Sequence, residues 1–153
     1  MHYGYFWIIR CSTSFYNEPN IKIAVDVINK SLQYVFFSKD RLHIDAEYSV
    51  YSLKSNGKKV RPADVSSGER NIIALCYFFV DIMRNLEENS CYNQACLLVV
   101  DDPVSSFDLE NRIGILSFLK AQLIAIMCGN INSKILIMTH DLPTFYDMEK
   151  VLE

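Results

Sequence analysis

Several features that would define a special class of protein are scarce or missing in this sequence. Glycine and proline number only 5 and 4 among 153 residues, and neither an internal repeat nor a low-complexity segment occurs. Half of the residues are hydrophobic, so the chain is long and apolar enough to bury a core without disulfides or metals. The sequence therefore predicts an ordinary globular domain.

Positive charge is not in excess either. The formal net charge is -3, so the chain has no general attraction to polyanions, and any contact with nucleic acid would need a local patch. One candidate patch, made of Lys54, Lys58, Lys59 and Arg61, surrounds a predicted hairpin tip. Short charge clusters of this kind are usually solvated turns, and we interpret this one in that way.

Signatures of disulfides and of membrane insertion are missing as well. The five cysteines are an odd number without a C-x-x-C pair, and Cys76 and Cys128 fall within apolar helical patterns, which indicates reduced thiols in a cytoplasmic protein. Cys91 and Cys96 have no histidine nearby in sequence and are interpreted as plain thiols rather than metal ligands. The apolar stretch 5–9 ends at Arg10 and is too short to span a bilayer, so we expect no signal peptide and no membrane anchor.

Apolar periodicity divides the chain after an unassigned segment, residues 1–19, into helices and strands. Helical spacing covers residues 21–37, 68–86 and 109–127, and the last of these places one set of apolar residues on a single face: Leu109, Ile113, Leu116, Leu119, Leu123, Ile126 and Met127. Alternation over residues 41–53, then a turn at 55–57 before 58–60, predicts a β-hairpin with one buried face: Leu42, Ile44, Ala46, Tyr48 and Val50.

Two continuous apolar runs, residues 95–100 and 135–138, flank the helix predicted at 109–127. Continuous runs are typical of strands that are covered on both faces, as in parallel sheets. We therefore predict an α/β fold with a parallel βαβ core, preceded by a helix and a β-hairpin, over residues 20–153.

Polar residues follow both apolar runs directly. Asp101 and Asp102 end the first run, and His140 follows the second. Ligands of open parallel sheets bind beyond the carboxyl ends of the strands, and an unpaired buried carboxylate would cost several kcal/mol, so these residues are expected to emerge together into a site. A hard cation is the natural partner of such a carboxylate pair.

A second polar motif lies at the start of the helix predicted from residue 68. Ser66, Ser67, Gly68 and Glu69 place hydroxyls, a small residue and backbone N–H groups at a helix N-terminus, where the helix dipole favours an anion. The simpler alternative is that the serines only cap the helix, with Glu69 in its favourable first turn.

The motifs together resemble the C-terminal half of an ABC-type ATPase head. Residues 65–70 resemble the signature sequence, residues 101–108 resemble a Walker B strand end and D-loop, and residues 139–141 resemble an H-loop, all in the family's order. The match is most similar to the AAA-type domain of RloC-like and PrrC-like anticodon nuclease ATPases, which are relatives of structural-maintenance-of-chromosomes proteins.

This resemblance implies a P-loop ATPase fold, with ATP and Mg²⁺ as ligands and a second ATPase head as partner. It implies that Asp101 binds magnesium, that Asp102 handles the attacking water and that His140 contacts the γ-phosphate. The signature residues would bind the nucleotide of the other head, and Ser105, Ser106 and Asp108 would communicate across the dimer. Nucleic acid would be reached through the full-length protein.

The sequence departs from this family in one important way, because it lacks a G-x-x-x-x-G-K-[ST] motif, the Walker A loop that cradles the nucleotide phosphates in the family. Of the glycines only Gly57 precedes a lysine, and Lys59 follows where a serine or threonine is required. We therefore expect weak or undetectable nucleotide binding by this chain alone. A truncated protein, a split partner and a gene remnant are all compatible with this pattern.

Two functions other than ATP hydrolysis remain open from the sequence. The chain could be a catalytically silent interaction module whose signature surface docks on an ATP-loaded head. Alternatively, Asp101, Asp102, Asp108 and His140 could form a metal-dependent phosphoesterase or nuclease site that needs no Walker A loop.

Overall fold

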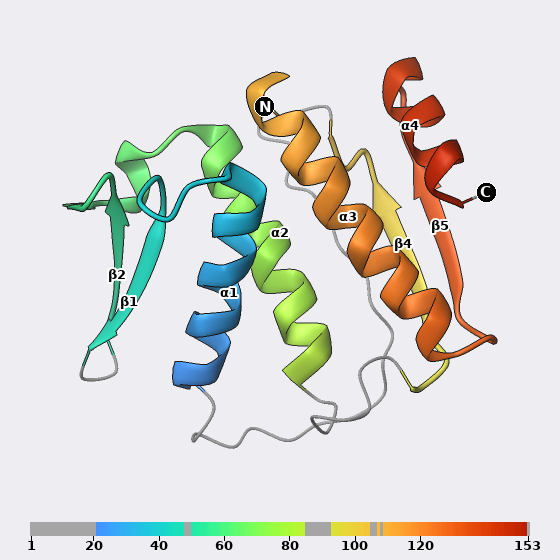
Figure 1. Cartoon of the computed structure of the whole chain (residues 1–153), viewed down its shortest axis with the longest axis horizontal. Coiled ribbons are helices and arrows are strands. Elements are labelled where there is room, and N and C mark those ends of the chain that lie inside the picture. The colour runs from blue at the N-terminus through green and yellow to red at the C-terminus, as the bar shows by residue number, and fades with distance from the viewer. Residues whose placement is uncertain (1–20, 48–49, 85–92, 105–106, 108, 153) are drawn as a thin grey trace.

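Two small sheets lie on opposite sides of a group of packed helices in the computed structural model, which describes residues 21–47, 50–84, 93–104, 107 and 109–152 (Figure 1). The first sheet joins β1 (His43–Glu47), β2 (Val50–Ser55) and β3 (Lys58–Val60), and the second joins β4 (Leu97–Asp101) and β5 (Lys134–Met138). The helices between them are α1 (Ile21–Phe36), α2 (Ser67–Arg84) and α3 (Leu109–Gly129). A short 3-10 helix, η2 (Pro62–Asp64), precedes α2, and α4 (Leu142–Leu152) follows β5.

The parallel βαβ unit predicted from the sequence is confirmed. β4 and β5 pair in parallel from Leu97 opposite Lys134 to Asp101 opposite Met138, and α3 connects them. Leu98 and Val100 of β4 are buried in the core, whereas Leu136 and Met138 of β5 are 49% and 43% exposed. One face of this sheet is therefore covered by helices and the other presents apolar side chains to solvent.

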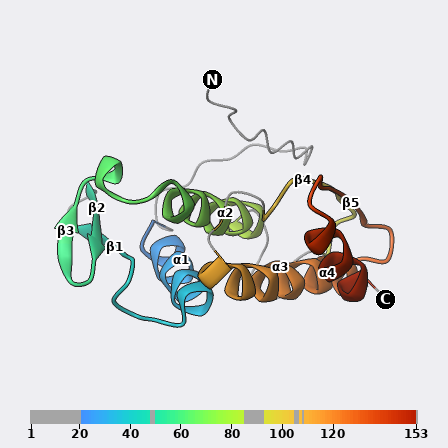
Figure 2. The same ribbon diagram turned by 90° about the horizontal axis from the view of Figure 1, so that it is seen from above.

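The core lies between the helices. α1 packs against both α2 and α3, and Phe79 of α2 meets Phe118 of α3 edge to face, with 5.6 Å between ring centroids. Figure 2 shows these three helices side by side, with the two sheets at either end. The largest fully buried side chains come mainly from these helices: Leu32, Val35, Ile72, Leu75, Phe79, Ile115, Leu119, Leu123 and Ile126.

Gly114 permits the close approach of α3 to α1. A Cβ atom at this position would lie 1.9 Å from the carbonyl oxygen of Val35, which is a backbone atom and cannot rotate away. Any larger residue would therefore push the two helices apart.

Substitution of Gly114 tests this contact. Alanine is the better helix former by about 1 kcal/mol, yet we expect Gly114→Ala to destabilise the protein by about 1–3 kcal/mol, because overpacking dominates. Chemical denaturation of the two proteins measures the difference. Ile113→Ala is the control, since Ile113 is 67% exposed and should cost much less; an unchanged Gly114→Ala protein would contradict the close contact.

The predicted β-hairpin needs a correction. Residues 41–53 do not form one strand, because β1 and β2 fold back on each other as antiparallel neighbours, and β3 then pairs with β2. Ile44 is opposite Leu53, and Leu53 is opposite Val60. The residues on this apolar face therefore have even numbers in β1 but odd numbers in β2. The prediction that alternate residues from Leu42 to Val50 share one face of a single strand is therefore wrong. Tyr48, a member of that predicted set, lies outside the described residues. Alternation alone cannot reveal a reversal between strands.

The turn between β2 and β3 is confirmed. Asn56 and Gly57 have φ values of +50° and +75°, the conformation that the tight hairpin turn favours and that Asn-Gly adopts readily. Gly57 thus serves a hairpin and not a phosphate-binding loop.

The predicted buried face of α3 also needs a correction. Leu119, Leu123 and Ile126 are buried as expected, but Ile113 is 67% and Met127 45% exposed, while Ile115 and Phe118 are buried instead. α3 carries apolar residues around most of its circumference, so helical periodicity did not select one side.

The segment Glu110–Gly129 of α3 is also long and apolar enough to cross a membrane by length and composition alone. A core helix of a globular protein passes the same test, and α3 contributes Ile115, Leu119 and Leu123 to the buried core.

The cysteines within the described residues are free thiols: Cys76 is buried, Cys96 partly buried and Cys128 exposed. Burial raises the pKa of Cys76 to about 12, and the reactive species of a thiol is the thiolate. Cys11 and Cys91 lie outside the described residues.

We expect iodoacetamide at mildly alkaline pH to modify Cys128 rapidly and Cys76 only after unfolding. Peptide mapping by mass spectrometry, with and without denaturant, measures both rates. Equal labelling of the two thiols in the native protein would contradict the buried position of Cys76.

Candidate functional site

The carboxyl ends of β4 and β5 bring the predicted polar residues together. The backbone N–H of Asp102 donates to the Met138 carbonyl at 2.7 Å, which extends the pairing of the strands by one residue beyond β4. Asp102 has a φ of +48°, a left-handed conformation that aspartate tolerates better than most residues. The chain therefore turns sharply at Asp102, immediately beyond the last paired residue.

Asp102 and His140 form a pair at this edge of the sheet. The Nδ1 atom of His140 lies 2.9 Å from Oδ2 of Asp102, and the Thr139 hydroxyl donates to Oδ1 at 3.1 Å. The Asp102 side chain is 16% exposed, whereas that of His140 is 78% exposed. A sheltered carboxylate thus holds an imidazole that faces solvent, and both groups can reach a ligand above the strand ends.

Asp101 completes the strand end. It is the last residue of β4, is exposed, and stands opposite Met138 in the parallel register. Magnesium keeps several waters and takes only one or two carboxylates from a protein together with substrate phosphates, so an exposed Asp101 fits such an ion. No group of three or more His, Cys, Asp or Glu side chains that could hold a metal occurs among the residues that the structure describes.

An unexpected polar network lies beside His140. The Asp141 carboxylate caps α4, because its Oδ2 accepts hydrogen bonds from the Thr144 N–H at 3.0 Å and from the Thr144 hydroxyl. Arg112 of α3 donates to the same Oδ2 at 2.8 Å and to the Thr144 hydroxyl oxygen at 3.0 Å. The capping role of Asp141 could have been found from the sequence, since an aspartate before a helix is a typical N-cap. The contact with Arg112 could not, because Arg112 is 29 residues away in the chain.

These contacts lower the pKa of Asp141 below its ordinary value of 3.8, through the Thr144 hydroxyl first and then Arg112. A carboxyl whose pKa is depressed by folding contributes stability above its unfolded pKa, and this contribution disappears as the pH falls through the folded value.

Asp141→Asn should therefore lower the melting temperature most at neutral pH. The gap between wild type and variant should narrow below about pH 4, where the unfolded carboxyl takes up a proton. Thermal unfolding followed by circular dichroism across this range measures the gap. Asp81→Asn, at an exposed position of α2, provides the control; a gap that is constant with pH would refute the depressed pKa.

The start of α2 is a complete capping box. The Glu69 N–H donates to Oγ of Ser66 at 3.1 Å, and the Ser66 N–H donates to the Glu69 carboxylate at 3.0 Å. Arg41 lies 3.5 Å from the same carboxylate. The capping interpretation of Ser66 is thus confirmed, while nucleotide binding by Ser66, Ser67, Gly68 and Glu69 stays a prediction.

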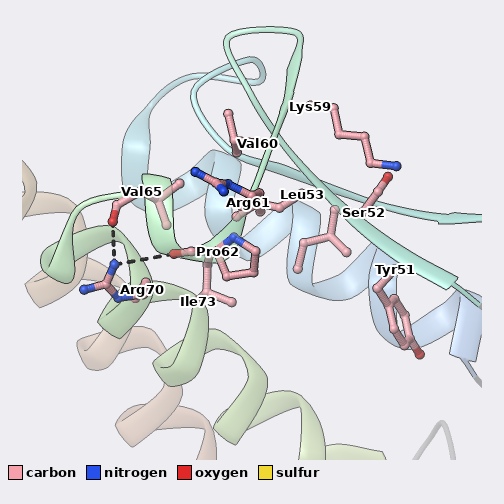
Figure 3. A pocket seen from close by; sticks show the side chains of 11 residues that line it. Tyr51, Ser52, Leu53, Lys59, Val60, Arg61, Pro62, Val65, Arg70 and Ile73 are labelled. Carbon is pink, nitrogen blue, oxygen red and sulfur yellow. Dashed lines mark hydrogen bonds between the residues drawn. The ribbon is translucent and has the colours of Figure 1, made fainter.

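A mostly apolar cavity of about 440 Å³ lies between β2, β3 and the start of α2 (Figure 3). Arg70, on its edge, donates to the carbonyl oxygens of Val65 at 2.6 Å and Pro62 at 3.4 Å, the contacts drawn as dashed lines. Arg70 thereby holds the segment that leads into Ser66 against α2. The cavity lining includes neither Asp102 nor His140.

The structure thus presents two groups of predicted residues. The start of α2 and the carboxyl ends of β4 and β5 lie on the same side of the molecule, the upper side in Figure 1. Ser105, Ser106 and Asp108, which the resemblance assigns to communication between heads, lie outside the described residues.

With this geometry in view, comparison with known proteins identifies the family. A sequence profile described as AAA domain matches residues 16–153. The chain belongs to the AAA domain family. Its mixed α/β architecture with a parallel two-stranded sheet is consistent with a P-loop-like fold, and membership indicates an ATPase-related function that uses nucleotide, usually with Mg²⁺.

The AAA domain is also similar to curated proteins of Staphylococcus aureus. The uncharacterized chromosomal cassette SCCmec type IVc protein CR006 of strain MRSA252 is 31% identical over 85 residues, which are 56% of this chain and 11% of that protein. A second Staphylococcus aureus protein with the same name aligns with the same identity and coverage. The alignment thus spans about a tenth of the relatives' length.

Proposed function

We propose that this AAA domain is the C-terminal part of an ABC-type ATPase head, which hydrolyses ATP after a segment or partner supplies a Walker A loop. The observation that carries the proposal is the Asp102–His140 pair, 2.9 Å apart at the carboxyl edge of a parallel sheet. This edge is where open α/β sheets bind ligands. The paired groups are of the kinds needed to orient water and to contact a phosphate.

In this proposal each residue at the strand ends has a distinct role. Asp102, held by Thr139 and His140, orients the attacking water, and His140 presents its exposed ring to the γ-phosphate. Asp101 reaches the magnesium ion, whose charge offsets that of the phosphates. Because phosphoryl transfer depends on positioning and charge stabilisation, the tight anchoring of Asp102 supports this assignment.

The start of α2 serves the nucleotide of a second head. Ser66 accepts the Glu69 N–H through Oγ, so its hydroxyl proton stays available to donate to a phosphate oxygen. The N–H groups of the first turn and the helix dipole add to the attraction. Glu69 opposes it with its own negative charge, and Arg41, 3.5 Å away, offsets part of that charge.

The uncovered face of the parallel sheet supports the need for a further segment. Leu97, Leu136 and Met138 are 56%, 49% and 43% exposed, although strands of parallel sheets are normally covered on both faces. A segment that carries the Walker A loop would reach the strand ends if it packed on this face.

The biological role follows the same resemblance. We propose that ATP turnover drives a nucleic-acid-directed effector in defence or repair, as in the RloC-like and PrrC-like proteins, and that the protein acts in the cytoplasm and without a membrane.

Measurement of phosphate release tests the proposed ATPase. The chain alone should release little phosphate from ATP, and mixing it with a Walker A-bearing segment of the same family should produce Mg²⁺-dependent release. Asp102→Asn should reduce that release by about 10²-fold or more, because it removes the group that handles water. Asp81→Asn makes the same chemical change on the exposed face of α2 and should leave activity intact.

Other outcomes point to the other functions. Full activity in Asp102→Asn would refute the assignment of Asp102. Binding to an ATP-loaded head without hydrolysis would favour an interaction module, and metal-dependent cleavage of nucleic acid by the chain alone would favour a nuclease.

A further inference from the structure

We infer that Arg112 is a positioning residue that holds His140 at Asp102 and connects this pair to the beginning of α3. The inference depends on the proposed function only for its consequence in ATP hydrolysis. The positional link itself is a property of the chain alone and can be measured without nucleotide.

His140 has few contacts of its own. Its side chain is 78% exposed, and within the described part of the chain its polar contact is with Asp102, so packing does little to determine where the ring lies. A side chain with so few contacts depends on the backbone on either side of it. The residues on both sides of His140 are therefore decisive.

Both neighbours of His140 are anchored. The Thr139 hydroxyl donates to Asp102 at 3.1 Å and accepts the N–H of Asp141 at 3.2 Å. Asp141 is in turn fixed by Thr144 and by Arg112, whose Nη2 lies 2.8 Å from Oδ2 of Asp141. His140 thus lies between one residue tied to β4 and another tied to α3.

The guanidinium of Arg112 can bind several groups of α4 at once. Its guanidinium contacts Asp141 at 2.8 Å, the Thr144 hydroxyl at 3.0 Å and Asp147 at 3.7 Å, so one group holds two turns of α4. Its side chain is 20% exposed and Thr144 is fully buried, so its contact with Thr144 is sheltered from water. A planar donor with several N–H groups holds such a set more rigidly than an ammonium group.

The position of Arg112 connects His140 with the beginning of α3. Arg112 lies in the first turn of α3, and residues 103–108 connect that helix to Asp102. A displacement of the beginning of α3 would move Asp141 and hence the backbone of His140, while Asp102 stays paired to Met138. A partner that contacts the beginning of α3 would thereby change the distance between His140 and Asp102.

Nuclear magnetic resonance of the purified chain tests the link directly. The chain has 3 histidines, so His140→Gln identifies the ring C–H signal of His140 in a proton–carbon correlation spectrum at neutral pH. Asp102→Asn gives the reference position of a ring without its carboxylate. We expect Arg112→Met to shift the His140 signal toward that position and Arg112→Lys to restore most of the wild-type position.

Lys120→Met is the matched control, because it removes an exposed cation from the same helix and should leave the His140 signal in place. Thermal melting shows which variants are folded. If Arg112→Met does not fold, Asp141→Asn provides the second test, since asparagine still caps a helix but lacks the charge that Arg112 binds.

A wild-type His140 signal in a folded variant, either Arg112→Met or Asp141→Asn, would overturn the inference, even if melting temperatures fell. A shifted signal in a chain that never supports ATP hydrolysis would keep the positional link and refute the proposed function. In an active complex, the same shift should accompany a loss of kcat that Arg112→Lys partly restores.

Discussion

The parallel pairing of β4 with β5 is the constraint on which the candidate site depends. It sets Asp101 opposite Met138, so the next residues of both strands, Asp102 and Thr139, leave the sheet at the same place. The hydrogen bond from Asp102 to the Met138 carbonyl then fixes the turn that brings the carboxylate to His140. A slip of one residue would send these side chains to the opposite face, because the side-chain period of a strand is 2.

α3 anchors the pair of strands β4 and β5 to the rest of the molecule. It connects the two strands, buries Leu119 and Leu123 in the core, and approaches α1 closely enough that position 114 must be glycine. The same helix carries Arg112 to the α4 cap. Packing and electrostatics therefore act on one element. The buried side chains of α3 fix its place, and Arg112 in its first turn binds Asp141, the neighbour of His140.

The beginning of α2 shows how the sequence stabilises a helix start. The Ser66–Glu69 capping box satisfies N–H groups that a helix start leaves unpaired. The start of α2 lies on the same side of the molecule as the carboxyl ends of β4 and β5, where Asp102 and His140 pair, and we propose that both contribute to phosphate recognition.

The sequence by itself determined the parallel βαβ core and the meeting of Asp102 and His140 at one edge of its sheet, because long apolar runs specify buried strands and consecutive parallel strands end at one edge. It did not reveal α4, the helix that follows β5. It did not determine the reversal between β1 and β2, since Ile44 and Leu53 continue one apolar face only through cross-strand pairing. Nor did it select the buried side of α3, where Ile113 is exposed and Ile115 buried, because nearly every side of that helix is apolar. The sequence also did not predict the contact between Arg112 and Asp141. An ion pair between residues far apart in the chain depends on how the helices pack, and no local sequence pattern specifies that packing.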